Sequence, residues 1–408
     1  MKRVIAFVVL ATAASCIDPY YPNLKGYKSL LVVEGLVTNE NRSYKVKLCK
    51  TVNDENSSPE KVTNADLYIS DSKGVKTHLL NCNDGYYKTD STSFTGVVGE
   101  EYSLQIKTAD GKEYVSDPAR MFAVPGIDSI YYEKADEMLG EPAASYTGIK
   151  IMLNSAQAGD AYSYFRWTYQ ETWKFLLPSP QRYTCTIVND TLLKFYEIPV
   201  IKEVCWKNAS SGEIITNSIV TEGSGNISGQ EITFIAPKLS DRLTQEYSIL
   251  VKQYSLSEKE FEFWNNLKKI NDAGGSIFDS QPFPVISNIH NINDASEMVL
   301  GYFEVSAVKE KRIFIPAGKL DSFSLPHYQT QCVEYVKSPS DWPPPSPMGK
   351  PPTWPEVYHI FMDTGDFTFI KPEMTPDSTL TKLVFALNVC SVCELSGTSA
   401  RPDFWVDL

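Results

Sequence analysis

The sequence predicts a mainly β protein, with a β-sandwich over residues 28–125 and a larger β-rich domain over residues 126–408 that contains one amphipathic helix. Three observations predict this fold class. Short segments of alternating apolar and polar residues recur in the first part of the chain, as strands with one buried face require. Turn signals rich in glycine and aspartate separate these segments at a spacing typical of a sandwich. The 408 residues are enough for two domains that each bury a core.

The strands of the predicted sandwich can be placed in order along the chain. An apolar run at Leu31–Val33 comes first, and alternating segments follow at residues 44–48, 65–69 and 102–107. Sequences such as Asn-Asp-Gly lie between them and favour tight turns. The pattern ends near residues 124–126, Val-Pro-Gly, which we interpret as the domain boundary.

The second domain is predicted to be β-rich with one helix. Ser257 can cap this helix, and Glu260 completes a capping box. Apolar residues then recur every three positions until the glycines at 274 and 275: Phe261, Trp264, Leu267 and Ile270. Such a stripe is typical of a helix that packs against a sheet. Strands are expected at residues 128–133, 162–169, 232–235, 247–253, 299–308 and 383–387.

A segment rich in proline and tryptophan occupies residues 338–355. Its prolines cannot join a central strand, so we expect an extended surface loop. Trp342 and Trp354 are candidate contacts for a sugar or a protein partner, because a stiff loop has little ordering entropy to lose. The alternative is that both tryptophans hold the loop against its own domain.

The first fifteen residues have the order of a secretory signal peptide. Two cations precede an apolar run from Val4 to Leu10, and small residues then lead to Cys16. The run is too short to span a bilayer. A cysteine after Ala-Ala-Ser is where a bacterial lipoprotein signal peptidase cleaves, so residues 1–15 are the predicted signal peptide and Cys16 the predicted lipid attachment site. The alternative is a soluble secreted protein with an incidental cysteine.

Residues 16–27 are predicted to be a lipidated tether, because their prolines disfavour helix. Acyl chains on Cys16, each contributing about 0.8 kcal/mol per buried methylene, would hold the protein on a membrane. No other segment is long and apolar enough to serve as an anchor, so we expect the lipid to be the only one.

The net charge of the chain argues against some classes of binding partner. The chain has 38 Lys and Arg against 50 Asp and Glu, a net charge of −12, without a basic stripe. This argues against binding to nucleic acid or to anionic lipid by electrostatics. Protein, sugar or a cation remain as partners.

The sequence contains no catalytic signature, and it predicts neither a catalytic residue, nor a metal site, nor a cofactor. Motifs for zinc proteases, phosphate-binding loops, nucleophile elbows and dinucleotide binding do not occur. The four histidines are scattered along the chain. Paired carboxylates for glycoside chemistry need a spatial separation that sequence does not provide.

The cysteines predict disulfides, because an exported chain meets an oxidising compartment. We expect Cys332 to pair with Cys393 or Cys390, which form a C-x-x-C sequence, and Cys185 to pair with Cys205 across a hairpin. Apart from Cys16 the number is odd, so at least one thiol stays free or pairs with another molecule. Which of Cys49 and Cys82 is paired stays open.

Several segments of the chain together resemble a lipoprotein family of the Bacteroidota that shares a domain of unknown function. They lie at residues 16–19, 30–39, 111–118, 128–133, 165–173, 281–291, 299–303 and 390–405. The resemblance implies an outer-membrane lipoprotein, commonly encoded beside a TonB-dependent receptor. It implies no catalytic residues. The first β segment also resembles transthyretin-like or immunoglobulin-like sandwiches in topology.

These observations support three hypotheses of function. The first is a non-enzymatic, lipid-anchored outer-membrane protein that faces outward and captures cargo for, or acts as a lid on, a TonB-dependent transporter. The second is a structural subunit of a surface assembly or an adhesin, docked through the Pro/Trp segment. The third is a hydrolase acting on surface glycans. Asp18, two residues after the lipid cysteine, favours export to the outer leaflet.

Overall fold

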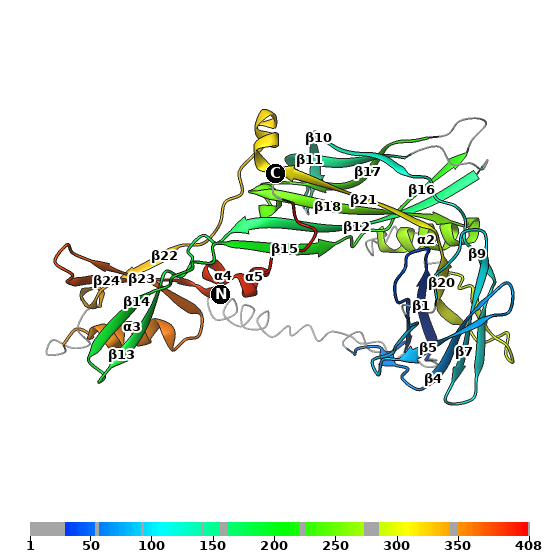
Figure 1. Ribbon diagram of the computed structural model, residues 1–408, viewed down its shortest axis with the longest axis horizontal. Coiled ribbons are helices and arrows are strands. Elements are labelled where there is room, and N and C mark those ends of the chain that lie inside the picture. The colour runs from blue at the N-terminus through cyan, green and yellow to red at the C-terminus, as the bar shows by residue number, and fades with distance from the viewer. Residues whose placement is uncertain are drawn as a thin grey trace, which may run out of the picture.

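The computed structural model describes residues 29–53, 57–90, 94–140, 142–155, 162–220, 226–272, 285–342 and 350–406. The chain is mainly β, as the sequence predicted. Figure 1 shows three parts in a row, which we call the sandwich, the central layers and the distal module. The predicted signal peptide, Cys16 and the tether lie outside the described residues.

The sandwich is one large sheet that folds around a single core, with strands in the order β19-β8-β7-β4-β5-β6-β2-β1-β20, while β3 and β9 pair at its sides. Its N-terminal strands are β1 (Leu31–Val37), β2 (Lys45–Lys50), β3 (Glu60–Lys61), β4 (Ala65–Asp71), β5 (Lys76–Asn81), β6 (Tyr86–Lys88), β7 (Glu101–Thr108), β8 (Glu113–Ser116) and β9 (Ala119–Arg120). Alternate residues of β7 are buried, and in β1 the buried residues are Leu31, Val33 and Val37, as the two-residue periodicity of a half-buried strand requires.

Two strands from much later in the chain complete this sheet. β20 (Val299–Val305) runs parallel to β1, and β19 (Ile289–Asn291) pairs with β8. The sequence analysis placed residues 299–308 in the second domain, so the boundary near residue 125 does not divide the structure cleanly. The local sequence pattern identifies a strand but not the strand with which it pairs. Parallel strands are joined by long connections, so the two partners can lie far apart in the sequence.

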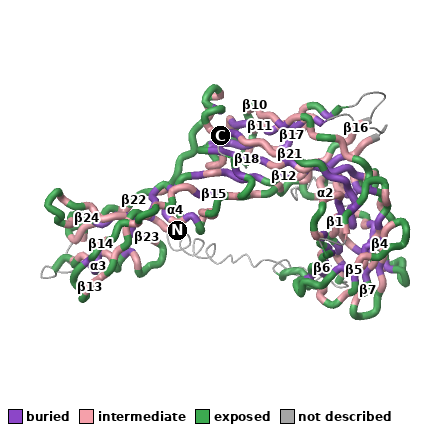
Figure 2. The backbone as a smooth tube through the Cα atoms, in the orientation of Figure 1, coloured by how far each residue is buried: buried purple, intermediate pink, exposed green. Residues whose placement is uncertain are grey.

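The central layers are two packed sheets built from long strands. One sheet has the order β10-β11-β17 and the other β15-β12-β18-β21, with β16 beside β12. Their apolar faces share one core that includes Phe165, Trp167 and Tyr247, and Figure 2 shows buried segments alternating with intermediate ones along these strands. The strands are β10 (Ile127–Leu139), β11 (Ala144–Ser155), β12 (Tyr162–Leu176), β15 (Val204–Ser210), β16 (Ile215–Val220), β17 (Ile227–Ile235), β18 (Glu246–Leu256) and β21 (Val308–Pro316); 3-10 turns lie at η1 (Asp241–Leu243) and η2 (Ala317–Phe323).

The predicted helix is α2 (Glu258–Asp272), which directly follows β18. Its predicted capping box is present, because the Ser257 amide donates to Glu260 Oε2 at 2.7 Å and the Glu260 amide donates to Ser257 Oγ at 3.3 Å. Phe263 is the buried aromatic of the helix, and it contacts Tyr302 of β20. The helix therefore lies between the central layers and the sandwich (Figure 1).

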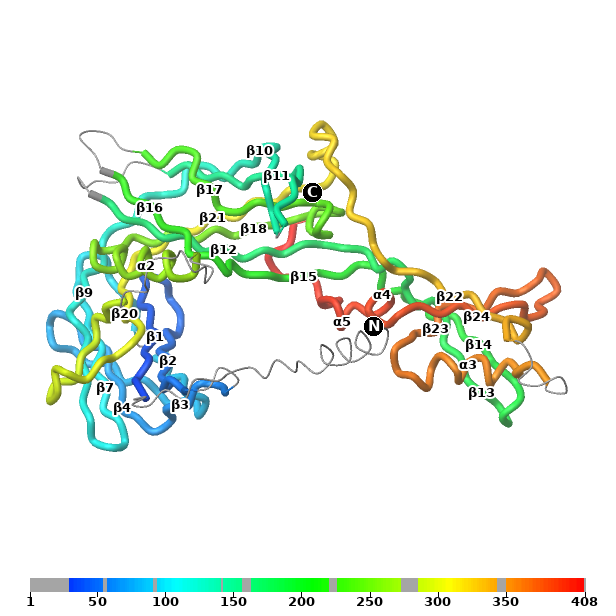
Figure 3. The backbone as a smooth tube through the Cα atoms, turned by 180° about the vertical axis from the view of Figure 1, so that it is seen from behind, coloured from blue at the N-terminus to red at the C-terminus, as the bar shows by residue number. Residues whose placement is uncertain are grey.

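The distal module packs a hairpin, a three-stranded sheet and a helix around an aromatic core that includes Phe361, Phe369 and Phe385. Figure 3 shows the short helices α4 and α5 between this module and β15. Its elements are β13 (Tyr183–Val188), β14 (Leu192–Glu197), β22 (Glu334–Lys337), η3 (Pro339–Asp341), α3 (Trp354–Met362), β23 (Phe367–Met374), β24 (Leu380–Leu387), α4 (Asn388–Ser391) and α5 (Cys393–Ser396).

The prediction that residues 338–355 form one extended loop is wrong at both ends. A 3-10 turn occupies residues 339–341, and Trp354 begins helix α3; residues 343–349 lie outside the described part. Thr353 and Glu356 form a capping box there, with Pro355 in the first turn, where its missing amide costs nothing. The residues of this capping box were visible in the sequence, but they were overlooked because they follow a segment rich in proline.

The disulfides confirm one predicted pair and contradict the other. Cys332 is bonded to Cys390, one of the two partners expected for it. Cys205 is bonded to Cys393 instead of to Cys185, which is a free thiol. The reason is topological, because the hairpin partner of β13 is β14, whereas β15 returns to the central layers and pairs with β12. Cys49 and Cys82 are also free.

Candidate functional site

A groove lies on the outer face of the sandwich sheet, beside α2. Strands β2, β1 and β20 are adjacent, and their alternate residues point to opposite faces. Val33 and Phe303 face the core, while α2 covers the other face at β20, where the Phe263 and Tyr302 ring centroids are 4.6 Å apart. The groove has a volume of about 620 Å³. Its lining is largely apolar: Val32, Gly35, Leu36, Tyr86, Phe263, Trp264, Leu267, Val285, Leu300, Gly301 and Tyr302, with Glu34, Lys45, Lys47, Arg166 and Glu304.

The composition of β1 explains the apolar floor. A strand with one solvent-exposed face alternates apolar and polar residues, but the sequence of β1 is Leu-Val-Val-Glu-Gly-Leu-Val. Leu31, Val33 and Val37 are buried in the core, and Val32 and Leu36 place aliphatic side chains on the outer face. The apolar run noted in the sequence therefore serves two surfaces, the core and the groove.

A buried cluster of polar and aromatic side chains forms the inner wall of the groove. Arg166 of β12 donates from Nη2 to both carboxylate oxygens of Glu304, at 2.8 and 3.0 Å. Trp264 Nε1 donates to Glu304 at 2.8 Å, and Ser306 Oγ donates at 2.9 Å. The guanidinium carbon of Arg166 also lies 4.4 Å from the centre of the Trp264 ring and 4.6 Å from that of Tyr254. Cation–π contacts of this kind strengthen when the cation is desolvated, as it is here.

A second carboxyl group, Glu260, lies completely buried behind this wall. The Val305 amide donates to its Oε1 at 2.9 Å and the Ser257 amide to its Oε2 at 2.7 Å. Burial raises the pKa of Glu260 to about 8, and the nearby negative charge of Glu304 adds to this effect. Burial likewise raises the pKa of the Tyr302 hydroxyl. Behind the wall, Glu260 therefore keeps its proton to a higher pH than an exposed glutamate does.

The arrangement of these carboxyl groups suits binding and support better than proton transfer. A general acid must present an oxygen to a bound substrate. Glu260 is 0% exposed and Glu304 is 2% exposed, and protein donors occupy the oxygens of both. Among the described residues, no group of three or more His, Cys, Asp or Glu side chains is placed to hold a metal ion.

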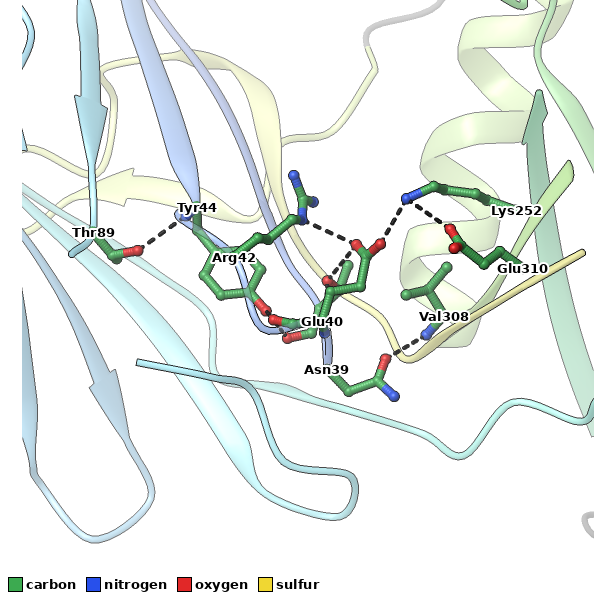
Figure 4. A network of polar contacts seen from close by, with 9 residues as sticks. Asn39, Glu40, Arg42, Tyr44, Thr89, Lys252, Val308 and Glu310 are labelled. Atoms are coloured by element: carbon green, nitrogen blue, oxygen red, sulfur yellow. Dashed lines mark hydrogen bonds and ion pairs between the residues drawn. The ribbon is translucent and has the colours of Figure 1, made fainter. Parts of the chain in front are cut away.

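A second polar network joins the sandwich to the central layers (Figure 4). Lys252 of β18 donates to Glu40 at 2.6 Å and lies 3.2 Å from Glu310 of β21. Arg42 is 3.0 Å from Glu40 on the other side. Burial alone would raise the pKa of Glu40, but the hydrogen bond and charge of Lys252 outweigh it and the pKa lies below the usual value. The Val308 amide donates to Asn39 at 2.8 Å.

The site residues predicted from the sequence lie elsewhere. Trp342 and Trp354 are half-buried against the distal core, and the ring of Trp342 lies 6.5 Å from that of Phe361. This arrangement matches the alternative in which they hold the segment to its own domain. Cys185 lies in the distal module, and the four bonded cysteines surround α4 and α5.

The groove itself was missed, although part of its signal was visible. Three of the segments that carry the family resemblance, residues 30–39, 165–173 and 299–303, supply β1, Arg166 and β20 and meet at this point. Trp264 and Leu267 belong to the predicted helical stripe, which was interpreted as core. No sequence pattern shows that these four elements converge.

Comparison with known proteins identifies a family. Residues 17–312 match a family model described as "Domain of unknown function (DUF4249)". The match covers the sandwich, α2 and most of the central layers, and therefore every element that lines the groove. No curated protein matches the chain. Within the part of the chain that the structure describes, no helix has both the length and the apolar character needed to cross a bilayer.

Proposed function

The chain belongs to the DUF4249 family, and from this premise we propose that it is a lipid-anchored outer-membrane protein that assists a TonB-dependent transporter. It faces the cell exterior and captures cargo, or covers the transporter, without catalysing a reaction. Lipid on Cys16 is its only membrane attachment, and it uses no cofactor and binds no nucleic acid. The order of charged, apolar and small residues before Cys16 supports the anchor.

The observation that carries this proposal is the position of the groove close in sequence to the predicted lipid. β1 begins at Leu31, fifteen residues after Cys16. A chain of this length spans at most about 50 Å when fully extended. With lipid on Cys16, the start of β1 would lie no farther than this from the membrane surface, which supports a role beside a transporter. A largely apolar concavity with a few polar groups is the usual form of a binding site for a small molecule.

The proposal is tested by purifying the lipidated chain from native outer membrane in mild detergent and identifying everything retained by mass spectrometry. We expect a TonB-dependent receptor in stoichiometric amount. The matched control is Cys16→Ala, which should leave the membrane fraction and retain no receptor. Recovery alone, or with other lipoproteins only, would contradict the transporter role and favour a structural subunit of a surface assembly.

Orientation needs a separate measurement. Protease treatment of intact cells should degrade the chain, because a protein on the outer leaflet is accessible to the enzyme. A periplasmic protein of known location provides the control and should survive. Complete protection of the chain would contradict exposure at the cell surface.

A further inference from the structure

The charged edge of the groove is unusual for so acidic a chain. β6 lies beside β2, and Lys45 of β2 is the direct register partner of Lys88 of β6. Like charges directly opposite on neighbouring strands are destabilising. Both side chains are exposed, and among the described residues neither has a hydrogen-bond or ion-pair partner. Two opposed cations without a counterion indicate a place where an anion is favoured.

The neighbouring residues extend this positive edge. Lys47, the next outward-facing residue of β2, pairs with Glu34 at 3.3 Å, so the charge of Glu34 is already offset. Arg166 and Glu304 neutralise one another at the opposite wall. The remaining charge in the lining of the groove is therefore that of Lys45, and Lys88 lies directly opposite it on β6, outside the lining. Tyr86, register partner of Lys47, adds a phenol hydroxyl to the same edge.

The apolar part of the groove begins directly beside these lysines. Leu36, Val32 and Leu300 form its floor, and Trp264 and Leu267 of α2 form its side. A volume of about 620 Å³ lies within the range of sites that enclose a small ligand, of roughly 300–1,000 Å³. The groove thus combines an apolar trough of small-molecule size with a cationic end.

We propose that this groove binds a small amphipathic anion, with its apolar body between β1 and α2 and its anionic head at Lys45 and Lys88. The inference rests on the proposed function for the fate of the ligand, since a bound molecule of this class would be the cargo. Binding itself is a property of the isolated chain, so it is tested without a transporter.

The experiment is calorimetric titration of the full mature chain, carrying Cys16→Ser so that no detergent competes for the groove. Dodecanoate is the anionic probe, and dodecanol and dodecylammonium are neutral and cationic probes of the same chain length. We expect dodecanoate to bind with one-to-one stoichiometry, and the other two probes to bind at least about tenfold more weakly.

Two matched variants locate the site. Lys45→Glu should weaken dodecanoate about tenfold, because it replaces attraction by repulsion at the head group, while leaving the melting temperature equal or higher, since the new carboxylate faces Lys88. Lys76→Glu makes the same charge change on β5 of the same sheet, away from the groove, and should bind as the parent does. Leu36→Gln should weaken all three probes by removing apolar contact.

Specific outcomes would overturn the inference. The inference is wrong if dodecanoate does not bind, if the three probes bind with equal affinity, or if the Lys45→Glu and Lys76→Glu variants bind dodecanoate with equal affinity. A chain that binds dodecanoate as expected but retains no transporter supports this inference and contradicts the proposed function. A chain that retains the transporter but binds no dodecanoate supports the proposed function and contradicts this inference.

Discussion

The central layers join their two neighbours by different chemistry. At the sandwich, the junction includes buried and part-buried ion pairs and hydrogen bonds, with Arg166 on Glu304 and Lys252 on Glu40, beside the contact of Phe263 with Tyr302. At the distal module it is covalent, because Cys205 of β15 is bonded to Cys393, and Cys390 three residues earlier is bonded to Cys332. The candidate groove lies at the polar junction. One end of the molecule should therefore respond to charge and pH, and the other to reductant.

The physical reason lies in what each contact requires. A buried ion pair stabilises only while both partners and their hydrogen bonds are in place, since each charge is costly to bury alone. A disulfide restricts the unfolded chain, and its contribution does not depend on a neighbouring charge. Each junction can therefore be perturbed separately by mutation.

The largest effect is expected from Arg166→Met, which breaks the polar junction. Glu304 would remain buried without its cation, at a cost of about 3–5 kcal/mol in the free energy of unfolding. Urea denaturation measures this loss, and hydrogen exchange should become faster in β20. The control is Arg182→Met, whose ion pair with Glu203 is solvent-exposed and should cost less than about 1 kcal/mol. Equal costs for the two variants would refute the importance of burial here.

A comparable or smaller effect, within the range of about 2–4 kcal/mol that is typical of a disulfide, is expected from Cys393→Ser at the covalent junction. The Cys205–Cys393 bond joins residues 188 apart in sequence, so its loss frees a long loop in the unfolded chain. Hydrogen exchange should become faster in β15 and stay unchanged in β20, and added reductant should have at least this effect on the parent, because it also reduces the Cys332–Cys390 bond. Cys82→Ser removes an exposed free thiol and should change stability by less than about 0.5 kcal/mol. Faster exchange in β20 would show that the junctions are not independent.

The smallest expected effect is a dependence of stability on pH at the polar junction. The raised pKa of Glu260, about 8, means that the folded chain holds a proton which the unfolded chain releases above about pH 4.5. Stability at the polar junction should therefore fall as pH rises from about 5 to 8. Glu260→Gln should flatten this dependence in urea titrations made across the range. An unchanged slope in the variant would assign the pH dependence to other groups.

The sequence predicted much of the local structure and little of the site. The capping box at Ser257 and Glu260 predicted α2, because its signals lie within four residues. The equivalent box at Thr353 and Glu356 was overlooked beside the prolines. The pairing of Cys185 was wrong because it assumed a single hairpin between Cys185 and Cys205, whereas β13 pairs with β14 and Cys205 lies in the following strand, which pairs with β12.

By itself, the sequence determined the mainly β character, the predicted export signal and the position of the long helix, since each depends on the order of neighbouring residues. Only the tertiary structure decided that β20 pairs with β1, that Arg166 reaches Glu304, and that an apolar outer face stays open beside α2. These contacts join residues more than a hundred positions apart, and chain closure over such distances depends on the packing of the whole fold. Periodicity specifies which face of a strand is apolar, but it cannot specify what covers that face.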